Sequence, residues 1–177
     1  YADLLYRPLL ALEADSALRG RVEGFLDHVI IDEYQDINAA QQRLLSVLVG
    51  TRAEVMAVGD ANQCIYEWRG AKPDTMLENF TATFGEATDY PLSTTFRHGH
   101  ALALAANHAI AANQRRPNQL CLAAANNPET RVSVGQGSRL LLDALMDWQA
   151  QGRAFNEASL LVRSWALSVP FQLALLQ

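Results

Sequence analysis

Lysine is almost missing from this 177-residue sequence: Lys72 is the only one, and every other Lys/Arg position is an arginine. The net charge is −5. Because contacts to phosphates need cationic surface, a chain of this composition makes a poor stand-alone binder of nucleic acids. Any contact with DNA must therefore rely on locally grouped arginines, or most of the contact surface must lie elsewhere.

Cysteines and long apolar runs are also scarce. Cys64 and Cys121 are too few for a disulfide framework and lack the spacing of a metal site. No apolar stretch reaches the ~18 residues that a membrane-spanning helix needs, and the N-terminal residues do not resemble a signal peptide. We therefore expect a reduced, cytoplasmic setting and no membrane partner.

A phosphate-binding loop is missing as well. Such a loop has the pattern Gly-x-x-x-x-Gly-Lys-Ser/Thr, whose backbone amides and lysine surround the phosphates of a nucleotide. Lys72 stands in Ala-Lys-Pro-Asp, and no glycine-rich turn precedes the first apolar strand. We therefore do not expect tight binding of a nucleotide by this chain alone.

The sequence does contain an alternation of short apolar strands and helices, which predicts an α/β fold with parallel strands. Half of the residues are apolar (50%), enough for a core. The predicted strands are 29–31 and 55–58, both buried on two faces, and 88–92, 131–134 and 160–162. The predicted helices are 1–22, 39–49 (capped by Asn38 or Asp36), 73–84, 98–112, 138–151 and 169–176, with 115–129 as loop. The first and last helices start and stop in mid-pattern, which suggests an excised piece of a longer chain.

Polar residues follow the first two predicted strands at the point where each ends. Asp32 and Glu33 follow the first strand, and Asp60 and Gln63 follow the second. Ligands bind beyond the carboxyl ends of parallel strands, so these side chains suggest a site for a metal ion, a water and a phosphate. Asp32 suits Mg²⁺, and Glu33 suits the orientation or deprotonation of a water. The alternative, commoner for an isolated Asp-Glu pair, is that both only open a loop and cap the next helix.

Two longer runs carry a family resemblance. Residues 29–36, Val-Ile-Ile-Asp-Glu-Tyr-Gln-Asp, resemble motif II (Walker B) of the UvrD/Rep family of superfamily 1 DNA helicases. Residues 58–71, Val-Gly-Asp-Ala-Asn-Gln-Cys-Ile-Tyr-Glu-Trp-Arg-Gly-Ala, resemble its motif III. Residues 92–98, Leu-Ser-Thr-Thr-Phe-Arg-His, are similar to motif IV, and residues 1–5 and 158–164 are similar to other segments of the family. Two long motifs in the right order form a specific signal.

The resemblance implies a P-loop NTPase (RecA-like) fold, in which parallel sheets carry flanking helices. Residues 1–92 would form the C-terminal part of the first RecA-like lobe, 1A. Residues 93–177 would form the N-terminal part of the second lobe, 2A, and would end near the point where the family inserts its 2B subdomain. Motifs V and VI of the family are not found in this sequence.

The resemblance also implies roles for individual residues. Asp32 would coordinate Mg²⁺, Glu33 would activate the hydrolytic water, and Gln63 would sense the γ-phosphate of ATP. Trp68 would stack on a base of single-stranded DNA, although a lone tryptophan is more often a core residue. Tyr66 is a second candidate for DNA binding, with packing as its alternative.

In the second lobe, Arg97 would neutralise charge on the γ-phosphate as an arginine finger does, and Phe96 would stack near the adenine. The alternative is a buried aromatic anchor beside a surface cation. Thr95 and His98 replace the usual Asn and Ser of motif IV, which leaves the hydrogen bonding of this loop open. In motif II, Gln35 and Asp36 would link the ATP site to motif III or cap the next helix.

These roles imply part of an ATP-dependent DNA helicase with 3′–5′ translocation, used in DNA repair or replication. Its cofactors would be ATP and Mg²⁺, and its partners would be single-stranded or duplex DNA and the remaining helicase domains. Because the phosphate-binding loop is missing, the isolated chain should be inactive. Two alternatives stay open: a non-catalytic, helicase-like interaction module, and the motor part of a helicase-nuclease subunit in recombination.

Overall fold

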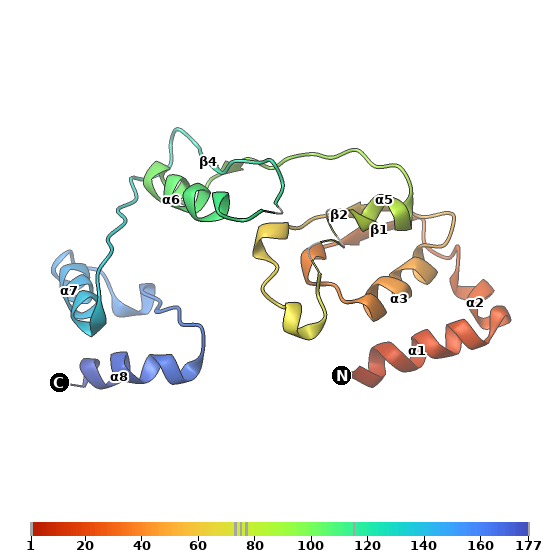
Figure 1. Ribbon diagram of the computed structural model, residues 1–177, viewed down its shortest axis with the longest axis horizontal. Helices are drawn as coiled ribbons and strands as arrows, with labels where there is room; N and C mark the ends of the chain where they lie inside the picture. Colours follow the sequence, from red (N-terminus) through yellow and green to blue (C-terminus); the bar gives the residue numbers. More distant parts are fainter. Residues whose placement is uncertain (1, 73, 75, 77, 115, 177) are drawn as a thin grey trace. The chain divides into compact units, whose positions relative to one another are not determined.

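The computed structural model describes residues 2–72, 74, 76, 78–114 and 116–176. The chain forms two compact units, residues 1–130 and 131–177, and Figure 1 shows their helices and strands coloured along the sequence. Two short parallel sheets with accompanying helices make this a mixed α/β fold, as the sequence predicts. The division into units does not test the predicted lobe boundary at residue 92, which stays a prediction.

Two helices precede the first strand, where the sequence predicts one long helix. α1 spans Ala2–Ala14 and α2 spans Ser16–Val22. Asp15 separates them because its carboxylate accepts hydrogen bonds from the N–H groups of Ala17 and Leu18, at 2.9 and 3.0 Å. These bonds satisfy donors at the start of α2 that have no partner within the helix. The prediction of a single unbroken helix is therefore wrong at Asp15.

The first sheet pairs β1 (His28–Ile31) with β2 (Glu54–Ala57) in parallel, and α3 (Ala39–Val49) lies between them in the sequence. The register places Ile31 opposite Ala57, so both strands end at the same edge of the sheet. This strand–helix–strand unit confirms the predicted elements to within one residue at each end. It places the residues that follow β1 and β2 beside one another.

Asn38 fixes the start of α3. Its side-chain oxygen accepts hydrogen bonds from the N–H groups of Ala40 and Gln41, and the Gln41 side chain accepts one from the Asn38 N–H. This reciprocal arrangement is a capping box. It confirms Asn38 as the cap, and the alternative that Asp36 caps this helix is wrong.

The core of the first unit forms on one face of this sheet. The Tyr34 side chain is fully buried (0% exposed), and its ring centroid lies 5.6 Å from that of Phe80 and 6.4 Å from that of Phe84. Both phenylalanines belong to α5 (Asn79–Phe84). The Tyr34 hydroxyl donates to Gln42 Oε1 at 3.0 Å, which ties the core to α3. The buried members of this cluster are Ile31, Tyr34 and Ile37.

The opposite face of the sheet is exposed. Ile30 and Met56 are register partners on it, and their side chains are 74% and 60% exposed. The prediction that these strands are buried on both faces is therefore wrong for the described residues. A continuous apolar run does not distinguish a strand with one buried face from a strand with two.

The second sheet is shorter and pairs β3 (Thr94–Thr95) with β4 (Leu122–Ala123) in parallel. α6 (His100–Ala111) lies between them in the sequence, as predicted. The Asn107 side chain fixes the approach to β4, since its amide donates to the Cys121 carbonyl and its oxygen accepts from the Cys121 N–H, both at 2.8 Å.

Two sequence predictions for this region are wrong: residues 88–92 form no strand, and the predicted loop 115–129 contains β4. The pairing between β3 and β4 sets the position of both strands. The Leu122 N–H, for example, donates to the Ser93 carbonyl at 2.8 Å. Tyr1 and Pro73, the predicted first residues of two helices, lie outside the residues that the structure describes.

The second unit is mainly helical. α7 (Gly137–Ala150) packs against α8 (Val169–Leu175), close to the predicted bounds of both. The strands predicted at 131–134 and 160–162 do not form; Val134 and Leu161 are 94% and 91% exposed in irregular backbone. Among the described residues, no helix has both the length and the apolar character needed to cross a membrane.

Candidate functional site

The backbone turns sharply where β1 ends. Glu33 adopts a left-handed conformation (φ 52°, ψ 43°) and is the only described non-glycine residue with positive φ. Asp32 supports this turn, because its Oδ1 accepts the Glu33 N–H at 2.9 Å. Both acidic side chains are exposed. A side chain held in a sparsely populated backbone conformation is a common feature of functional sites.

The ends of β1 and β2 are joined by backbone hydrogen bonds beyond the paired strands. The Val58 N–H donates to the Ile31 carbonyl at 2.8 Å, and the Tyr34 N–H donates to the Val58 carbonyl at 3.0 Å. The second bond bypasses Asp32 and Glu33, which therefore stand out from the sheet edge as a short loop. The residues after β2 are thus fixed against this acidic loop.

Gln35 joins the two strand ends through its side chain. This side chain is buried (2% exposed) in the 3₁₀ turn Tyr34–Asp36. Its Nε2 donates to Glu33 Oε2 at 2.7 Å, and its Oε1 accepts the Asp60 N–H at 3.0 Å. The sequence prediction left open whether Gln35 links the ATP site to motif III or caps the next helix; the bridge agrees with the first alternative.

Asp60 and Gln63 extend the same hydrogen-bond chain. The Asp60 carboxylate caps the 3₁₀ turn Ala61–Gln63 by accepting the Asn62 N–H at 2.9 Å, and its other oxygen accepts from Gln63 Nε2 at 2.8 Å. The chain therefore runs from Gln63 through Asp60 and Gln35 to Glu33. We call these four residues the strand-end network.

An aromatic pair follows the strand-end network in the sequence. The rings of Tyr66 and Trp68 meet edge to face at 6.4 Å between centroids. The Arg69 guanidinium lies 5.1 Å from the centre of the Tyr66 ring and 4.4 Å from that of Trp68. Trp68 is 74% exposed, so it is not the core tryptophan that the alternative interpretation expects. An exposed aromatic face of this kind is open to stacking.

Phe96 and Arg97 lie in the loop between β3 and α6, and both side chains are exposed. The exposure of Phe96 (77%) contradicts the alternative that it is a buried anchor. The loop itself is held by Asn127, whose Nδ2 donates to the carbonyls of Thr95 and His98 at 2.8 and 2.7 Å. Sequence reasoning missed Asn127, because its partners lie about 30 residues away in the chain.

Comparisons with known proteins agree with the motifs. The UvrD/REP helicase N-terminal domain matches residues 1–84. The ATP-dependent DNA helicase Rep of Escherichia coli is 35% identical over 113 residues, which cover 64% of this chain and 17% of that protein. DNA helicase II of the same organism is 31% identical over 183 residues, which cover 100% of this chain and 25% of that protein.

The chain belongs to the UvrD/Rep helicase family. A third relative, the ATP-dependent DNA helicase PcrA of Staphylococcus aureus, is 30% identical over 146 residues, or 80% of this chain and 20% of that protein. The chain thus spans a quarter or less of the length of these family members. All three relatives are DNA helicases by name.

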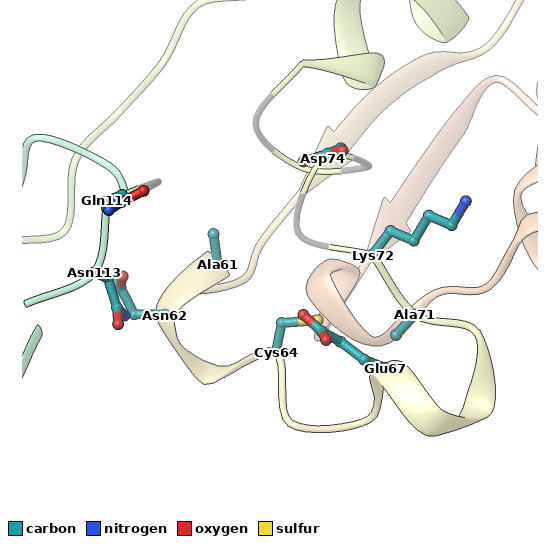
Figure 2. A pocket seen from close by; sticks show the side chains of 9 residues that line it. All are labelled: Ala61, Asn62, Cys64, Glu67, Ala71, Lys72, Asp74, Asn113 and Gln114. Carbon is teal, nitrogen blue, oxygen red and sulfur yellow. The ribbon is translucent and has the colours of Figure 1, made fainter.

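A cavity of about 630 Å³ lies beside residues 58–71, the segment that corresponds to motif III (Figure 2). Figure 2 shows the side chains of Cys64 and Glu67 close together at its wall. The chain's single lysine, Lys72, lines it too. The described residues include no group of three or more His, Cys, Asp or Glu side chains that could hold a metal ion.

Two proton-binding side chains near the strand-end network should make the free energy of unfolding change with pH in the alkaline range. Burial raises the pKa of the Tyr34 hydroxyl above its ordinary value of 10.0. Burial, followed by the negative charges of Glu67 and Asp36, raises the pKa of the Cys64 thiol above its ordinary value of 9.0. Both groups therefore hold their protons more tightly in the folded chain than in the unfolded chain.

We expect the free energy of unfolding to fall as the pH rises through this range. The stabilisation is fully present below the unfolded pKa values and is lost as the pH rises through the folded ones, because the unfolded chain ionises first. Urea unfolding measured between about pH 8 and pH 11 tests this. Cys64→Ala should flatten the first part of the decline and Tyr34→Phe the later part. The expectation is wrong if both variants keep the wild-type pH profile.

Proposed function

We propose that this chain is part of the motor of an ATP-dependent DNA helicase. The observation that carries the proposal is the strand-end network, in which hydrogen bonds connect Glu33 of motif II to Gln63 of motif III. Membership of the UvrD/Rep family supports the same assignment. We further propose that residues 1–92 and 93–177 belong to the first and second RecA-like lobes, since the described parallel pairs have the strand–helix–strand order of such lobes.

In this proposal the acidic loop after β1 performs hydrolysis. Glu33 accepts a proton from the water whose oxygen attacks the γ-phosphorus of ATP, while the bond to the bridging oxygen of the departing ADP breaks. Asp32 would hold Mg²⁺ through its water shell; it fits because the carboxylate is exposed at a strand end and only one of its oxygens is needed for the Glu33 N–H. Bound Mg²⁺ would neutralise phosphate charge. Gln63 would sense the γ-phosphate.

Arg97 and Phe96 would contribute from the second lobe. An exposed guanidinium on a loop fixed by Asn127 suits an arginine finger, which must reach a phosphate without reorganising its backbone. We propose that Phe96 stacks near the adenine. Exposure of its ring in the absence of nucleotide is consistent with that role.

We propose that single-stranded DNA contacts Trp68, with Tyr66 as its neighbour. The chain's acidity does not oppose this, because stacking on an aromatic face needs no net positive charge. Arg69, held against both rings, adds a cation at the same place. Translocation in the 3′–5′ direction and use in DNA repair or replication are further proposals that rest on the family resemblance alone.

The proposal is tested with the longer polypeptide that would carry this segment, called the parent polypeptide below. We expect DNA-stimulated ATP hydrolysis and strand separation from the parent polypeptide. We expect neither from residues 1–177 alone, because their sequence contains no phosphate-binding loop. A parent polypeptide without DNA-stimulated hydrolysis would refute the proposal, and would favour the interaction module instead.

Trp68→Ala in the parent polypeptide should weaken binding of single-stranded DNA. Loss of one stacked base costs about 1–3 kcal/mol, or roughly a 5- to 150-fold weaker dissociation constant. Fluorescence anisotropy with a labelled oligonucleotide measures this. Trp165→Ala is the matched control, since Trp165 is also exposed (85%) but lies outside motif III. Equal DNA affinities for the two variants would contradict the DNA role of Trp68.

A further inference from the structure

We propose that Gln35 is a positioning residue: its buried side-chain amide holds the Glu33 carboxylate in place and connects it to the Asp60–Gln63 turn. The inference rests on the proposed function, since it concerns the residue that would activate the water. The family resemblance already implies that Gln35 could link the ATP site to motif III; the inference adds the atoms that make this link and the hold on the Glu33 carboxylate.

The orientation of the amide follows from its two partners. The backbone N–H of Asp60 can only donate, so the atom that faces it at 3.0 Å must be the carbonyl oxygen of Gln35. The amino group is then directed to Glu33 Oε2 at 2.7 Å. An amino group can only donate, so it fixes the position of the Glu33 carboxylate by a hydrogen bond to one of its two oxygens. One amide thus holds the Glu33 side chain and the Asp60 backbone at the same time.

Burial of the Gln35 side chain strengthens its hydrogen bond to Glu33. Gln35 is 2% exposed, whereas the Glu33 side chain that it contacts is exposed. A hydrogen bond from a buried, fixed donor is less weakened by water than one between two surface groups. With Oε2 of Glu33 engaged by Gln35, we assign the proton of the attacking water to Oε1.

Gly59 provides the space that the amide occupies. A Cβ atom at position 59 would lie 2.4 Å from Gln35 Oε1 and 3.1 Å from the Tyr34 backbone nitrogen. The 2.4 Å contact is shorter than real Cβ contacts, so any side chain at this position must displace the amide. Position 59 directly precedes Asp60, whose N–H is the second partner of the amide. The glycine is therefore required by the bridge, although its φ is not positive.

The connection also gives a route between the two motifs. Gln63 donates to Asp60 Oδ2, and the backbone of Asp60 donates to Gln35. A shift of the Ala61–Gln63 turn when Gln63 meets a γ-phosphate would therefore move the amide that holds Glu33. Glu33 would take its hydrolytic position only when the phosphate is present.

The test compares three variants of the parent polypeptide by steady-state ATP hydrolysis and nucleotide binding. Gln35→Met keeps the size of the side chain and removes both hydrogen bonds. We expect kcat to fall about 10- to 100-fold while KM and the nucleotide dissociation constant stay within about threefold. Gly59→Ala should do the same, because it displaces the amide without changing any hydrogen-bonding group. Tyr34→Phe is the control, since it removes a buried hydroxyl beside Gln35 without touching the network.

A fourth variant separates positioning from simple loss of stability. Gln35→Glu can still accept the Asp60 N–H, but at neutral pH it faces Glu33 with a second carboxylate. When the pair takes up one proton, the hydrogen bond to Glu33 is restored. We therefore expect kcat of Gln35→Glu relative to wild type to rise as the pH is lowered, which a structural role would not produce.

A readout without nucleotide comes from the side-chain amide signals of Gln35 in the NMR spectrum of residues 1–177. These signals should differ between wild type and Glu33→Ala, because the substitution removes the carboxylate to which the amino group donates. The inference is overturned if Gln35→Met keeps wild-type kcat in an active parent polypeptide. It is also overturned if the Gln35 amide signals stay at their wild-type positions when the Glu33 carboxylate is removed. The proposed function fails in a different way: it is overturned if the wild-type parent polypeptide hydrolyses ATP no faster than its Glu33→Gln variant. The two failures can therefore be told apart.

Discussion

Glu33→Gln in the parent polypeptide should lower the rate of ATP hydrolysis about 10²- to 10⁴-fold, the usual contribution of a general base. Nucleotide affinity should remain, because the substitution keeps the shape of the side chain and removes only its ability to take a proton. A glutamine oxygen can still accept the hydrogen bond from Gln35, so the strand-end network persists. Single-turnover hydrolysis and equilibrium nucleotide binding together measure the two effects.

The matched control for this variant is Glu54→Gln. Glu54 is an exposed carboxylate at the opposite end of the same sheet, in β2, where it pairs with His28. Removal of its charge should leave hydrolysis unchanged. If Glu33→Gln hydrolyses ATP as fast as Glu54→Gln, the assignment of Glu33 as the base is refuted.

Tyr34→Ala should destabilise the first unit by about 3–5 kcal/mol, as expected for removing a large aromatic side chain from a core. Tyr34 is fully buried, and its ring contacts both Phe80 and Phe84. Tyr34→Phe keeps the ring and loses only the hydroxyl bond to Gln42, which should cost about 0.5–1.5 kcal/mol. Urea unfolding of residues 1–177 measures both.

The difference between the two variants is what tests the role of the ring. Tyr34 stands between Glu33 and Gln35, so its packing fixes the backbone from which both functional side chains project. Costs within about 1 kcal/mol of each other would show that the aromatic cluster contributes little to the core.

Much of the first unit could be predicted from the sequence because its signals are local. Asn38 and Gly50 mark the two ends of α3, and short apolar runs mark β1 and β2. The strands predicted at 88–92, 131–134 and 160–162 failed because an apolar run becomes a strand only when a partner strand lies beside it. β3 and β4 were missed for the converse reason, since each has two residues and forms only through the other.

The candidate site was predictable as a set of residue types but not as an arrangement. Asp32, Glu33 and Gln63 were singled out because they follow apolar strands and match family motifs. A link through Gln35 was one of two alternatives for that residue, but its atoms and partners could not be predicted, because its oxygen meets the Asp60 N–H across 25 residues of sequence. Hydrogen bonds of this range depend on the register between β1 and β2, which no pattern in either strand specifies.

The left-handed backbone at Glu33 has a consequence for the evolution of this chain. A non-glycine residue in that conformation costs the fold roughly 1–2 kcal/mol. Glycine would relieve this cost at the same position, but it would remove the carboxylate. Thermal stability alone would therefore favour glycine at position 33; if Glu33 is the base that we propose, its carboxylate is the reason for a glutamate there. Under the proposed function, the turn is a point where activity and stability oppose each other, as they often do in enzymes.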